Sequence, residues 1–292
     1  MKELTIISGK GGTGKTSITG SFAALAKNKV LADCDVDAAD LHLILWPEIK
    51  KREEFTGGKI AYINNDMCTS CGKCVEVCQF DAISEDYVVD PVSCEGCSVC
   101  VHFCPVDAIE FNPAVNGEWY ISDTRFGPMV HARLGIAEEN SGKLVSIVRQ
   151  QAKNLAEQQG LDLVIVDGAP GVGCPVISSL TGTNAVLIVT EPTLSGMHDL
   201  KRVASLANDH FKIPTYVCVN KFDLNTKLTD QVEVYCREHD IVLAGKIRYD
   251  TIFTEAMIHE KTVVEYSDGE VSKEIQAIWE RLSADLISNK NK

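Results

Sequence analysis

Residues 9–16 read Gly9-Lys10-Gly11-Gly12-Thr13-Gly14-Lys15-Thr16 and follow a short β-branched run, Leu4-Thr5-Ile6-Ile7. Residues 17–27 are mostly small and predict a helix directly after the glycines. A glycine-rich loop between a strand and a helix directs backbone N–H groups at phosphate oxygens, and the helix dipole adds positive potential. We therefore expect Lys15 to contact the β- and γ-phosphates of a nucleotide and Thr16 to hold Mg²⁺. The rest of the phosphate site is predicted to comprise Gly11, Gly12, Thr13, Gly14 and Ser17.

The rest of the chain repeats the order strand, loop, helix. Apolar strands are predicted at residues 30–32, 161–166, 185–189, 216–219 and 241–243, and helices at 142–159 and 198–208. Such strands, each followed by a helix, are typical of a parallel sheet covered on both faces. The predicted fold class is therefore α/β, a doubly wound, mostly parallel sheet. Apolar residues at helical spacing over 271–287, with both charge signs on the other face, predict a packed terminal helix and no stable membrane anchor.

A second motif lies between residues 68 and 105, where two C-x₂-C-x₂-C-x₃-C runs follow each other 26 residues apart. This is the ligand pattern of a bacterial-type ferredoxin with two [4Fe–4S] clusters, in which the fourth cysteine of each run binds the other cluster. Pro105 follows the second run as expected, whereas Gln79 replaces the proline after the first. Zinc is the alternative, but no set of histidines accompanies the cysteines. The crossover rule predicts one cluster on Cys68, Cys71, Cys74 and Cys104, and the other on Cys94, Cys97, Cys100 and Cys78.

The cysteine segment is predicted to be inserted into the nucleotide-binding domain, because nucleotide-domain character returns after it, near Trp119. Residues 50–58 are polar and end in glycine, which indicates a linker. We therefore expect a P-loop domain formed by residues 1–56 and 114–292, interrupted at 57–113 by a ferredoxin-like domain of α+β structure. Cys174 and Cys236 lie outside this segment and have no assigned role.

Composition limits the function further. The 292 residues carry a formal net charge of −13, which argues against a nucleic-acid partner. Between Asp66 and Asn112 nine acids stand against one base, Lys73, so this segment suits a basic redox partner protein. Cysteines in cluster spacing indicate a reducing interior, and the first residues contain no basic start or cleavage site, so we expect a cytoplasmic protein.

Lys10 makes the phosphate loop more specific, because K-G-G-x-G-K-[ST] is the deviant Walker A pattern. The sequence resembles the MinD/ParA/nitrogenase-iron-protein class of ATPases. In that class the early lysine reaches the nucleotide of the other subunit, which implies that Lys10 acts in a nucleotide-dependent homodimer, or in a heterodimer with a related ATPase. The resemblance implies catalytic roles for Lys10, Lys15, Asp35 and Asp167. It also implies Mg²⁺ contacts by Thr16, Asp33 and Asp167, and a second switch at residues 168–171.

Residues 220–223 bear on which base the nucleotide carries. Asn220-Lys221-Phe222-Asp223 fits the guanine-recognition pattern N-K-x-D. In the MinD-like class, however, the corresponding asparagine contacts adenine, so the resemblance implies ATP and a role for Asn220 in binding it.

The likeness extends to MinD-superfamily ATPases with an inserted ferredoxin domain, and covers nearly the full length. It is carried by residues 129–135, 139–143, 169–175 and 190–196 as well as by both motifs. Cys174 lies near the position of a dimer-bridging cluster ligand in nitrogenase iron protein. Residues 111–160 contain no cysteine for the second ligand, so no third cluster is expected.

Three functions fit these parts. In the first, ATP binding and hydrolysis control electron transfer through the two clusters. In the second, the protein assembles or delivers iron–sulfur or related metal cofactors, although its C-terminal region has only Cys236 where such relatives carry C-x-x-C. In the third, it is a positioning ATPase whose clusters sense redox state. We favour the first, because the insertion follows the first switch region, which the resemblance places at Asp33 and Asp35.

Overall fold

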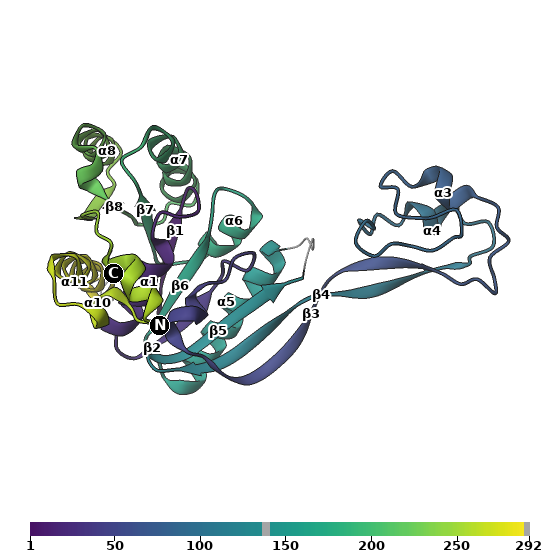
Figure 1. Ribbon diagram of the computed structural model, residues 1–292, viewed down its shortest axis with the longest axis horizontal. Coiled ribbons are helices and arrows are strands. Elements are labelled where there is room, and N and C mark those ends of the chain that lie inside the picture. Colours follow the sequence, from purple (N-terminus) through teal and green to yellow (C-terminus); the bar gives the residue numbers. More distant parts are fainter. Residues whose placement is uncertain (136–140, 289–292) are drawn as a thin grey trace. The chain divides into compact units, whose positions relative to one another are not determined.

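A computed structural model describes residues 1–135 and 141–288, which form two compact units (Figure 1). The first unit contains Met1–Arg52, Trp119–Ala132 and residues 141–288, and the second contains Glu53–Glu118 and residues 133–135. The predicted domain boundaries at 56/57 and 113/114 fall within two long strands, β3 (Glu48–Ile63) and β4 (Ile109–Thr124). The division into domains therefore stays a prediction. Glu139 and Asn140, part of one motif quoted above, lie outside the described residues.

The strands form a nine-stranded sheet in the order β3-β4-β5-β2-β6-β1-β7-β8-β9. Every pairing from β5 through to β9 in this order is parallel. The predicted α/β class with a mostly parallel sheet is confirmed. The remaining strands are β1 (Lys2–Ser8), β2 (Lys29–Asp33), β5 (Gly127–Leu134), β6 (Leu163–Pro170), β7 (Ala185–Thr190), β8 (Thr215–Asn220) and β9 (Val242–Ile247).

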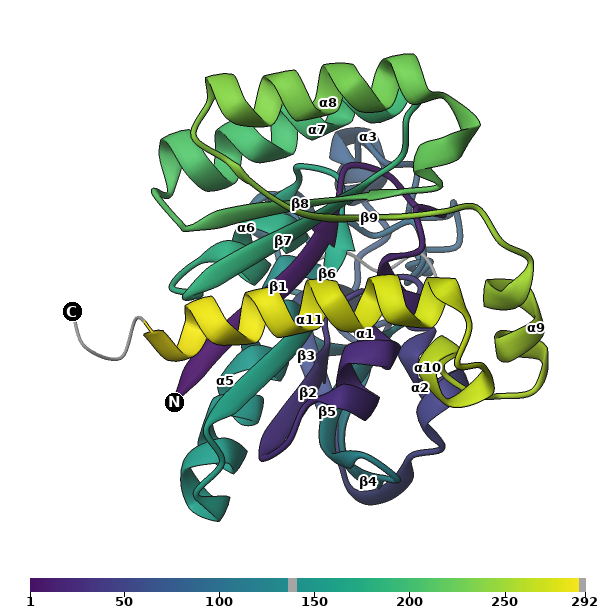
Figure 2. The same ribbon diagram turned by 90° about the vertical axis from the view of Figure 1, so that its left-hand side faces the viewer.

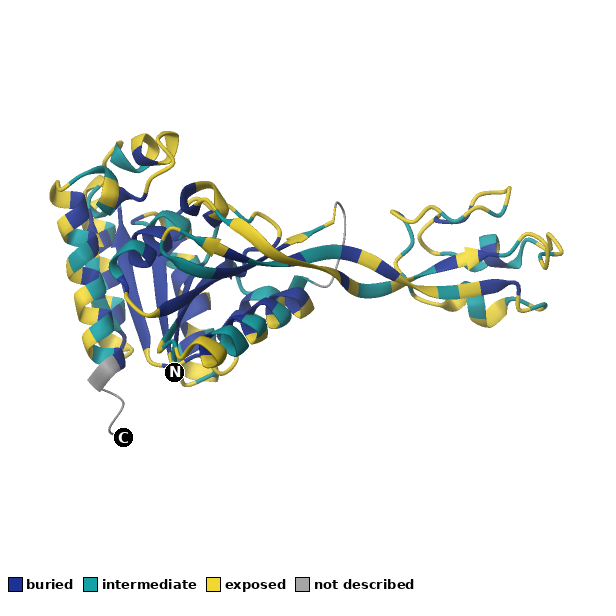
Figure 3. Cartoon of the chain, turned by 90° about the horizontal axis from the view of Figure 1, so that it is seen from below, coloured by how far each residue is buried: buried dark blue, intermediate teal, exposed yellow. Residues whose placement is uncertain are grey.

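Helices cover both faces of the sheet because side chains of a strand alternate between its faces. Leu4 and Ile6 of β1 pack in one core with α1, α2 and α11, and Ile7 packs in the other with α6, α7 and α8. The central strands are buried along most of their length (Figure 3). The α-helices of the first unit are α1 (Lys15–Leu25), α2 (Leu41–Leu45), α5 (Ser141–Gln159), α6 (Cys174–Leu180), α7 (Leu194–Ala204), α8 (Thr226–Glu238), α9 (Ile252–Ile258), α10 (Val263–Tyr266) and α11 (Glu270–Ser288); a π-helical turn (Ser205–His210) continues α7 and a 3-10 turn (Phe222–Leu224) precedes α8.

The terminal helix α11 packs on the sheet as its sequence predicts. It crosses one face next to α1 (Figure 2), and its Ile275 and Ile278 are buried in the same core as Phe22. Trp279 adds a ring contact to Phe22 with centroids 5.2 Å apart. Within the described ranges, no helix combines the length and the apolar character needed to cross a membrane.

The predicted linker at residues 50–58 is wrong, because these residues form part of β3. Seven consecutive positions from Glu48 to Glu54 are exposed, and the first buried side chain of the strand is Phe55. No apolar alternation therefore marks this strand in the sequence, and its pairing with β4 supplies the stabilising contacts instead.

The second unit contains two short helices, α3 (Lys73–Val77) and α4 (Val99–Phe103), with a small core that includes Ala61, Ile63, Ile83 and Ile109. The 26-residue repeat of the sequence extends to the backbone. Asp81 and Asp107 both have positive φ, 51° and 53°, and the residues before α3 and α4 are also left-handed. Two halves of the unit therefore follow the same local path around their cysteines.

Candidate functional site

The glycine-rich loop joins β1 to α1 and borders a cavity of about 590 Å³ in the first unit. Gly12 and Gly14 have φ of 78° and 89°, a conformation that side chains disfavour, so glycine is required at both positions. Lys10, Asp33 and Asp167 do not line the cavity. It is lined by Ser8, Gly11, Gly12, Thr13, Gly14, Lys15, Thr16, Ser17, Asp35, Ala38, Asp40, Pro170, Asn220, Lys221, Tyr249, Asp250, Thr251, Phe253, Thr254, Glu255 and Met257.

Lys15 is paired with two carboxylates beside the cavity. Its Nζ lies 2.8 Å from Asp167 Oδ1 and 3.4 Å from Asp35 Oδ2. Burial disfavours the charged amine, but the carboxylates of Asp167 and Asp35 outweigh this effect and raise the pKa of Lys15. The ammonium group is therefore held charged at the start of α1, where phosphate oxygens can replace the carboxylates.

Asp167 receives two further hydrogen bonds from α1. The Thr16 hydroxyl donates to its Oδ2 at 2.8 Å, and the Thr19 hydroxyl lies 3.0 Å from its Oδ1. Asp167 is completely buried near the end of β6, so these contacts and Lys15 compensate its charge. Sequence reasoning missed Thr19, which lies one turn beyond the motif and could have been found from the helical spacing to Lys15.

Asp33 and Asp35 are in different environments. Asp33 is paired in register with Asp167 on the neighbouring strand and is fully buried, and burial together with the Asp167 charge raises its pKa well above the usual range. Its carboxylate accepts the backbone N–H groups of Asp35 and Leu41. Asp35 lines the cavity, so the structure brings Asp35 to the nucleotide side and uses Asp33 to hold the loop before α2.

Lys10 lies on the other side of the loop and contacts two residues that follow β7. Its Nζ is 3.3 Å from Glu191 Oε2 and 3.4 Å from Ser195 Oγ. Glu191 also pairs with Lys221, and the two lysines outweigh its partial burial and lower its pKa. Sequence reasoning included Glu191 in a quoted motif but assigned it no role, because no local pattern indicates its contact with Lys10.

The N-K-x-D residues differ in their access to the cavity. Asn220 lines it, and its Nδ2 donates to the carbonyl of Thr13 at 2.8 Å. Asp223 Oδ1 instead accepts the backbone N–H of Tyr249 at 2.7 Å, and Asp223 is not among the lining residues. The carboxylate that would read guanine is therefore already used to hold the segment at Tyr249.

The eight motif cysteines lie in two groups around two cavities of the second unit. The Cys68 group (Cys68, Cys71, Cys74 and Cys104) lines one cavity, and the Cys94 group (Cys78, Cys94, Cys97 and Cys100) lines the other. The structure thus brings together the two sets that the crossover rule predicts. Within residues 1–135 and 141–288, no three or more His, Cys, Asp or Glu side chains are arranged to hold a single metal ion.

The four other cysteines are separate from these groups. Cys34 and Cys218 are buried, and burial raises the pKa of each thiol. Cys236 is also buried, and burial raises its pKa to about 11. Cys174 is exposed at the start of α6, where it lies close to Gly142 of α5.

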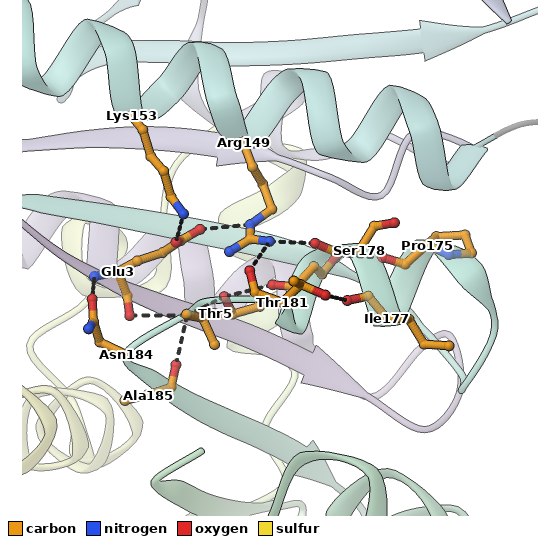
Figure 4. A network of polar contacts seen from close by, with 12 residues as sticks. Glu3, Thr5, Arg149, Lys153, Pro175, Ile177, Ser178, Thr181, Asn184 and Ala185 are labelled. Carbon is orange, nitrogen blue, oxygen red and sulfur yellow. Dashed lines mark hydrogen bonds and ion pairs between the residues drawn. The ribbon is translucent and has the colours of Figure 1, made fainter. Parts of the chain in front are cut away.

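A buried ion-pair network connects the start of β1 to α5 and α6 (Figure 4). The Arg149 Nε donates to Glu3 Oε1 at 2.7 Å, and Lys153 Nζ lies 2.8 Å from Glu3 Oε2. The Arg149 guanidinium also donates to the carbonyls of Ser178 and Thr181, at the end of α6. This network fixes two helices against the strand that ends in the phosphate loop.

Comparison with known proteins assigns this chain to a family. Residues 4–263 match the family model described as the CobQ/CobB/MinD/ParA nucleotide binding domain. The chain belongs to this family. It is 37% identical over 284 residues to the uncharacterized protein MJ0578 of Methanocaldococcus jannaschii, covering 96% of each chain, and 26% identical over 301 residues to MJ0579 of the same organism, covering 92% of this chain and 94% of that one.

Solved MinD structures share the fold of this family member. The cell division ATPase MinD of Pyrococcus furiosus superposes with a TM-score of 0.58 at 16% identity, covering 97% of this chain and 98% of that one. MinD of Pyrococcus horikoshii, complexed with Mg-ADP, gives a TM-score of 0.60 at 15% identity, covering 100% and 99%. At this identity the likeness is one of fold.

Proposed function

We propose that this protein binds and hydrolyses ATP and couples its nucleotide state to electron transfer through two [4Fe–4S] clusters. The observation that carries the proposal is the presence, in one chain, of a P-loop cavity and of two separate groups of four cysteines. Membership of a MinD/ParA nucleotide-binding family supports the ATPase part. The cysteine groups alone support the redox part.

In the nucleotide half, Lys15 would bind the β- and γ-phosphates, and Thr16 and Asp167 would hold Mg²⁺ with Asp33 behind them. Asp35, which lines the cavity, would orient the attacking water. The engagement of Asp223 with Tyr249 supports adenine over guanine, and Asn220 remains at the cavity to contact the base. When the nucleotide binds, its phosphate oxygens must replace the carboxylates of Asp167 and Asp35 as the partners of Lys15.

The cysteine cavities fit the clusters by their donor set. Each cavity offers four thiols, and a cluster of four irons takes one thiolate per iron. A cluster takes these thiolates one per iron around the whole cubane, whereas a single zinc ion takes all four at one atom. When bound, each cluster supplies one-electron redox chemistry. Burial raises the pKa of Cys74 and Cys100, so metal binding would have to remove protons that these thiols otherwise keep.

The path of the chain supports a coupling between the two halves. Asp33 holds the loop up to Leu41, α2 follows directly, and β3 then continues into the second unit. A change in the Asp33–Leu41 loop on nucleotide binding would therefore act on the segment that leads to the cysteines. We further propose that Lys10 leaves Glu191 to reach the nucleotide of a second subunit. That subunit would be a second copy or a related ATPase; Methanocaldococcus jannaschii has two chains related in sequence to this one, MJ0578 and MJ0579.

One observation favours cluster delivery as a second candidate. Cys71 and Cys97 are exposed, one in each group, so a cluster bound there would be open to an acceptor protein. Transfer of intact clusters to a metal-free acceptor protein, with rates that depend on ATP, would favour delivery over electron transfer.

The deciding experiment is an anaerobic EPR titration of both clusters without nucleotide, with MgADP and with a non-hydrolysable ATP analogue. A nucleotide-dependent change in potential is expected for the unaltered protein and none for Lys15→Ala, which tests whether the change comes from the P-loop. Equal potentials in all three states would contradict redox coupling.

A further inference from the structure

The two cysteine cavities are built from equivalent positions of the 26-residue repeat, which makes them an internal comparison. Both are lined by four cysteines, and both include the alanine that follows a left-handed aspartate, Ala108 in one and Ala82 in the other. Differences between the cavities therefore come from the other lining side chains and not from a different backbone path. Comparing the two cavities as cluster sites rests on the proposed function.

Three equivalent lining positions differ in charge or polarity. The cavity of the Cys68 group has Thr69, Gly72 and Lys73. The cavity of the Cys94 group has Glu95, Ser98 and Val99 at the corresponding positions. The first cavity thus includes a cation and a hydroxyl, whereas the second includes an acid and a hydroxyl.

Lys73 is partly neutralised by a neighbour, which reduces the difference in charge. Its Nζ lies 3.0 Å from Glu76, which is 70% exposed and does not line the cavity. His102 occupies the position equivalent to Glu76 in the other half. Counting the pair as neutral, the Cys94 group still has one more negative charge at its cavity, that of Glu95.

A hydrogen bond adds to the same difference. The backbone N–H of Ala108 donates to Cys104 Sγ at 3.3 Å, in the Cys68 group. Tyr87 also lines this cavity, with its hydroxyl donating to the Ser70 carbonyl at 2.8 Å, whereas Val89 and Phe111 line the other. Donors to the sulfurs stabilise the more negative reduced state, and apolar side chains limit its solvation.

Reduction of a cluster adds one negative charge without forming or breaking a bond, so a nearby cation or a donor to a sulfur raises the reduction potential and a nearby acid lowers it. We infer that the Cys68 group holds the cluster of higher reduction potential, and that Lys73 and Glu95 set this order. An electron supplied by an external one-electron reductant then resides at the Cys68 group, and the Cys94 group accepts the second electron.

The test is a reciprocal exchange across the repeat, followed by anaerobic EPR titration with dithionite as the reductant. In the unaltered protein the first electron is expected to reside on the Cys68 group about ten times as often as on the Cys94 group. This ratio corresponds to a difference of about 59 mV between the two reduction potentials, for a one-electron couple. Val99→Lys should raise the reduction potential of the cluster at the Cys94 group, and Lys73→Val should lower that of the cluster at the Cys68 group. Each change therefore reduces the difference between the two potentials. Glu95→Gln should also reduce it by raising the lower potential, whereas Glu85→Gln, an exposed acid that lines neither cavity, should not.

The direction of these changes identifies the clusters without a separate assignment. If Val99→Lys raises the upper potential, or if the two potentials are equal in the unaltered protein, the inference is wrong. Iron and sulfide content and circular dichroism check that each variant is folded and loaded. A protein that binds fewer than two clusters in its unaltered form would instead refute the proposed function, so the two failures are distinguishable.

Discussion

The two regions of this chain achieve order in different ways. In the first unit the polar groups around the phosphate loop are already paired with each other, as Lys15 is with Asp167 and Lys10 with Glu191, above a sheet with two cores. In the second unit the core is small and is built partly from the motif cysteines: Cys74 belongs to it, and Cys68, Cys78, Cys94, Cys100 and Cys104 pack against it. The sheet orders the nucleotide site, whereas metal is expected to order the cysteine unit.

This difference implies that the two sites respond differently to loss of a single group. At the nucleotide site, removal of one charge leaves other buried charges without partners. In the cysteine unit, removal of one thiol is expected to affect the proposed cluster and the local fold, and to leave the sheet of the first unit intact.

The largest effect is expected at the phosphate loop. Lys15→Ala should abolish nucleotide binding, because it removes the charge that neutralises the phosphates and leaves Asp167 and Asp35 to repel them. Lys10→Ala should preserve binding and reduce hydrolysis by at least about 10²-fold, the usual cost of losing a group that stabilises transition-state charge. Calorimetry for binding and phosphate release for turnover separate the two variants. Normal turnover in Lys10→Ala would contradict its cross-subunit role.

Loss of a cluster should affect the second unit alone. Cys68→Ser is expected to remove or alter one cluster and to increase hydrogen exchange around α3 and α4, while nucleotide binding by the first unit is retained. Cys218→Ser, a substitution of a buried cysteine outside both groups, is the matched control for iron content. Unfolding of the first unit in Cys68→Ser would show that the two regions do not fold separately.

A smaller but still large effect is expected for the buried network of the first unit. Arg149→Ala leaves Glu3 with Lys153 alone and frees the carbonyls of Ser178 and Thr181, so the free energy of unfolding should fall by about 3–5 kcal/mol. Lys153→Ala, at a half-buried position, should cost less. Chemical denaturation of both variants measures the difference, and equal losses would show that Arg149 is not the main partner of Glu3.

Much of the first unit could be predicted from sequence because local patterns decide it. The phosphate loop follows a β-branched strand, and the apolar runs at β7 and β8 are long enough to indicate buried strands. The repeat spacing of the cysteines likewise predicted which four gather around each cavity. These features depend on residues that are close in sequence or that repeat at a fixed distance.

The missed features depend on contacts between distant residues. The exposed, charged first half of β3 predicts a linker. It is a strand because it pairs with β4, a contact that the sequence does not show. Glu191 reaches Lys10 from a distant part of the sequence, and Asp223 is occupied by Tyr249 through a backbone hydrogen bond. No periodicity or motif predicts such pairs, because the fold brings them together.

The pH dependence of stability should also distinguish the regions. Burial lowers the pKa of His131 in the first unit to about 4, and His42 contributes. A histidine with a depressed native pKa contributes full stability above its unfolded value of about 6.5, and the contribution is lost as the pH falls toward 4. The loss amounts to about 3 kcal/mol, at about 1.36 kcal/mol per pKa unit. His131→Gln should reduce the slope of unfolding free energy between about pH 6.5 and 4. An unchanged slope would show that other groups, chiefly carboxyls, dominate acid unfolding.

The smallest effect is expected at Asp223, although its N-K-x-D motif suggests a large effect on nucleotide preference. Asp223→Asn changes the acid of the N-K-x-D pattern, yet the ratio of ATP to GTP affinity should change less than about twofold, because this carboxylate accepts the Tyr249 N–H and does not line the cavity. Asn220→Ala, at a position that does line it, should weaken binding of ATP. Competition binding with both nucleotides measures the ratio for each variant. A marked loss of GTP binding in Asp223→Asn would mean that the carboxylate turns to the base, and that the contact with Tyr249 breaks when nucleotide binds.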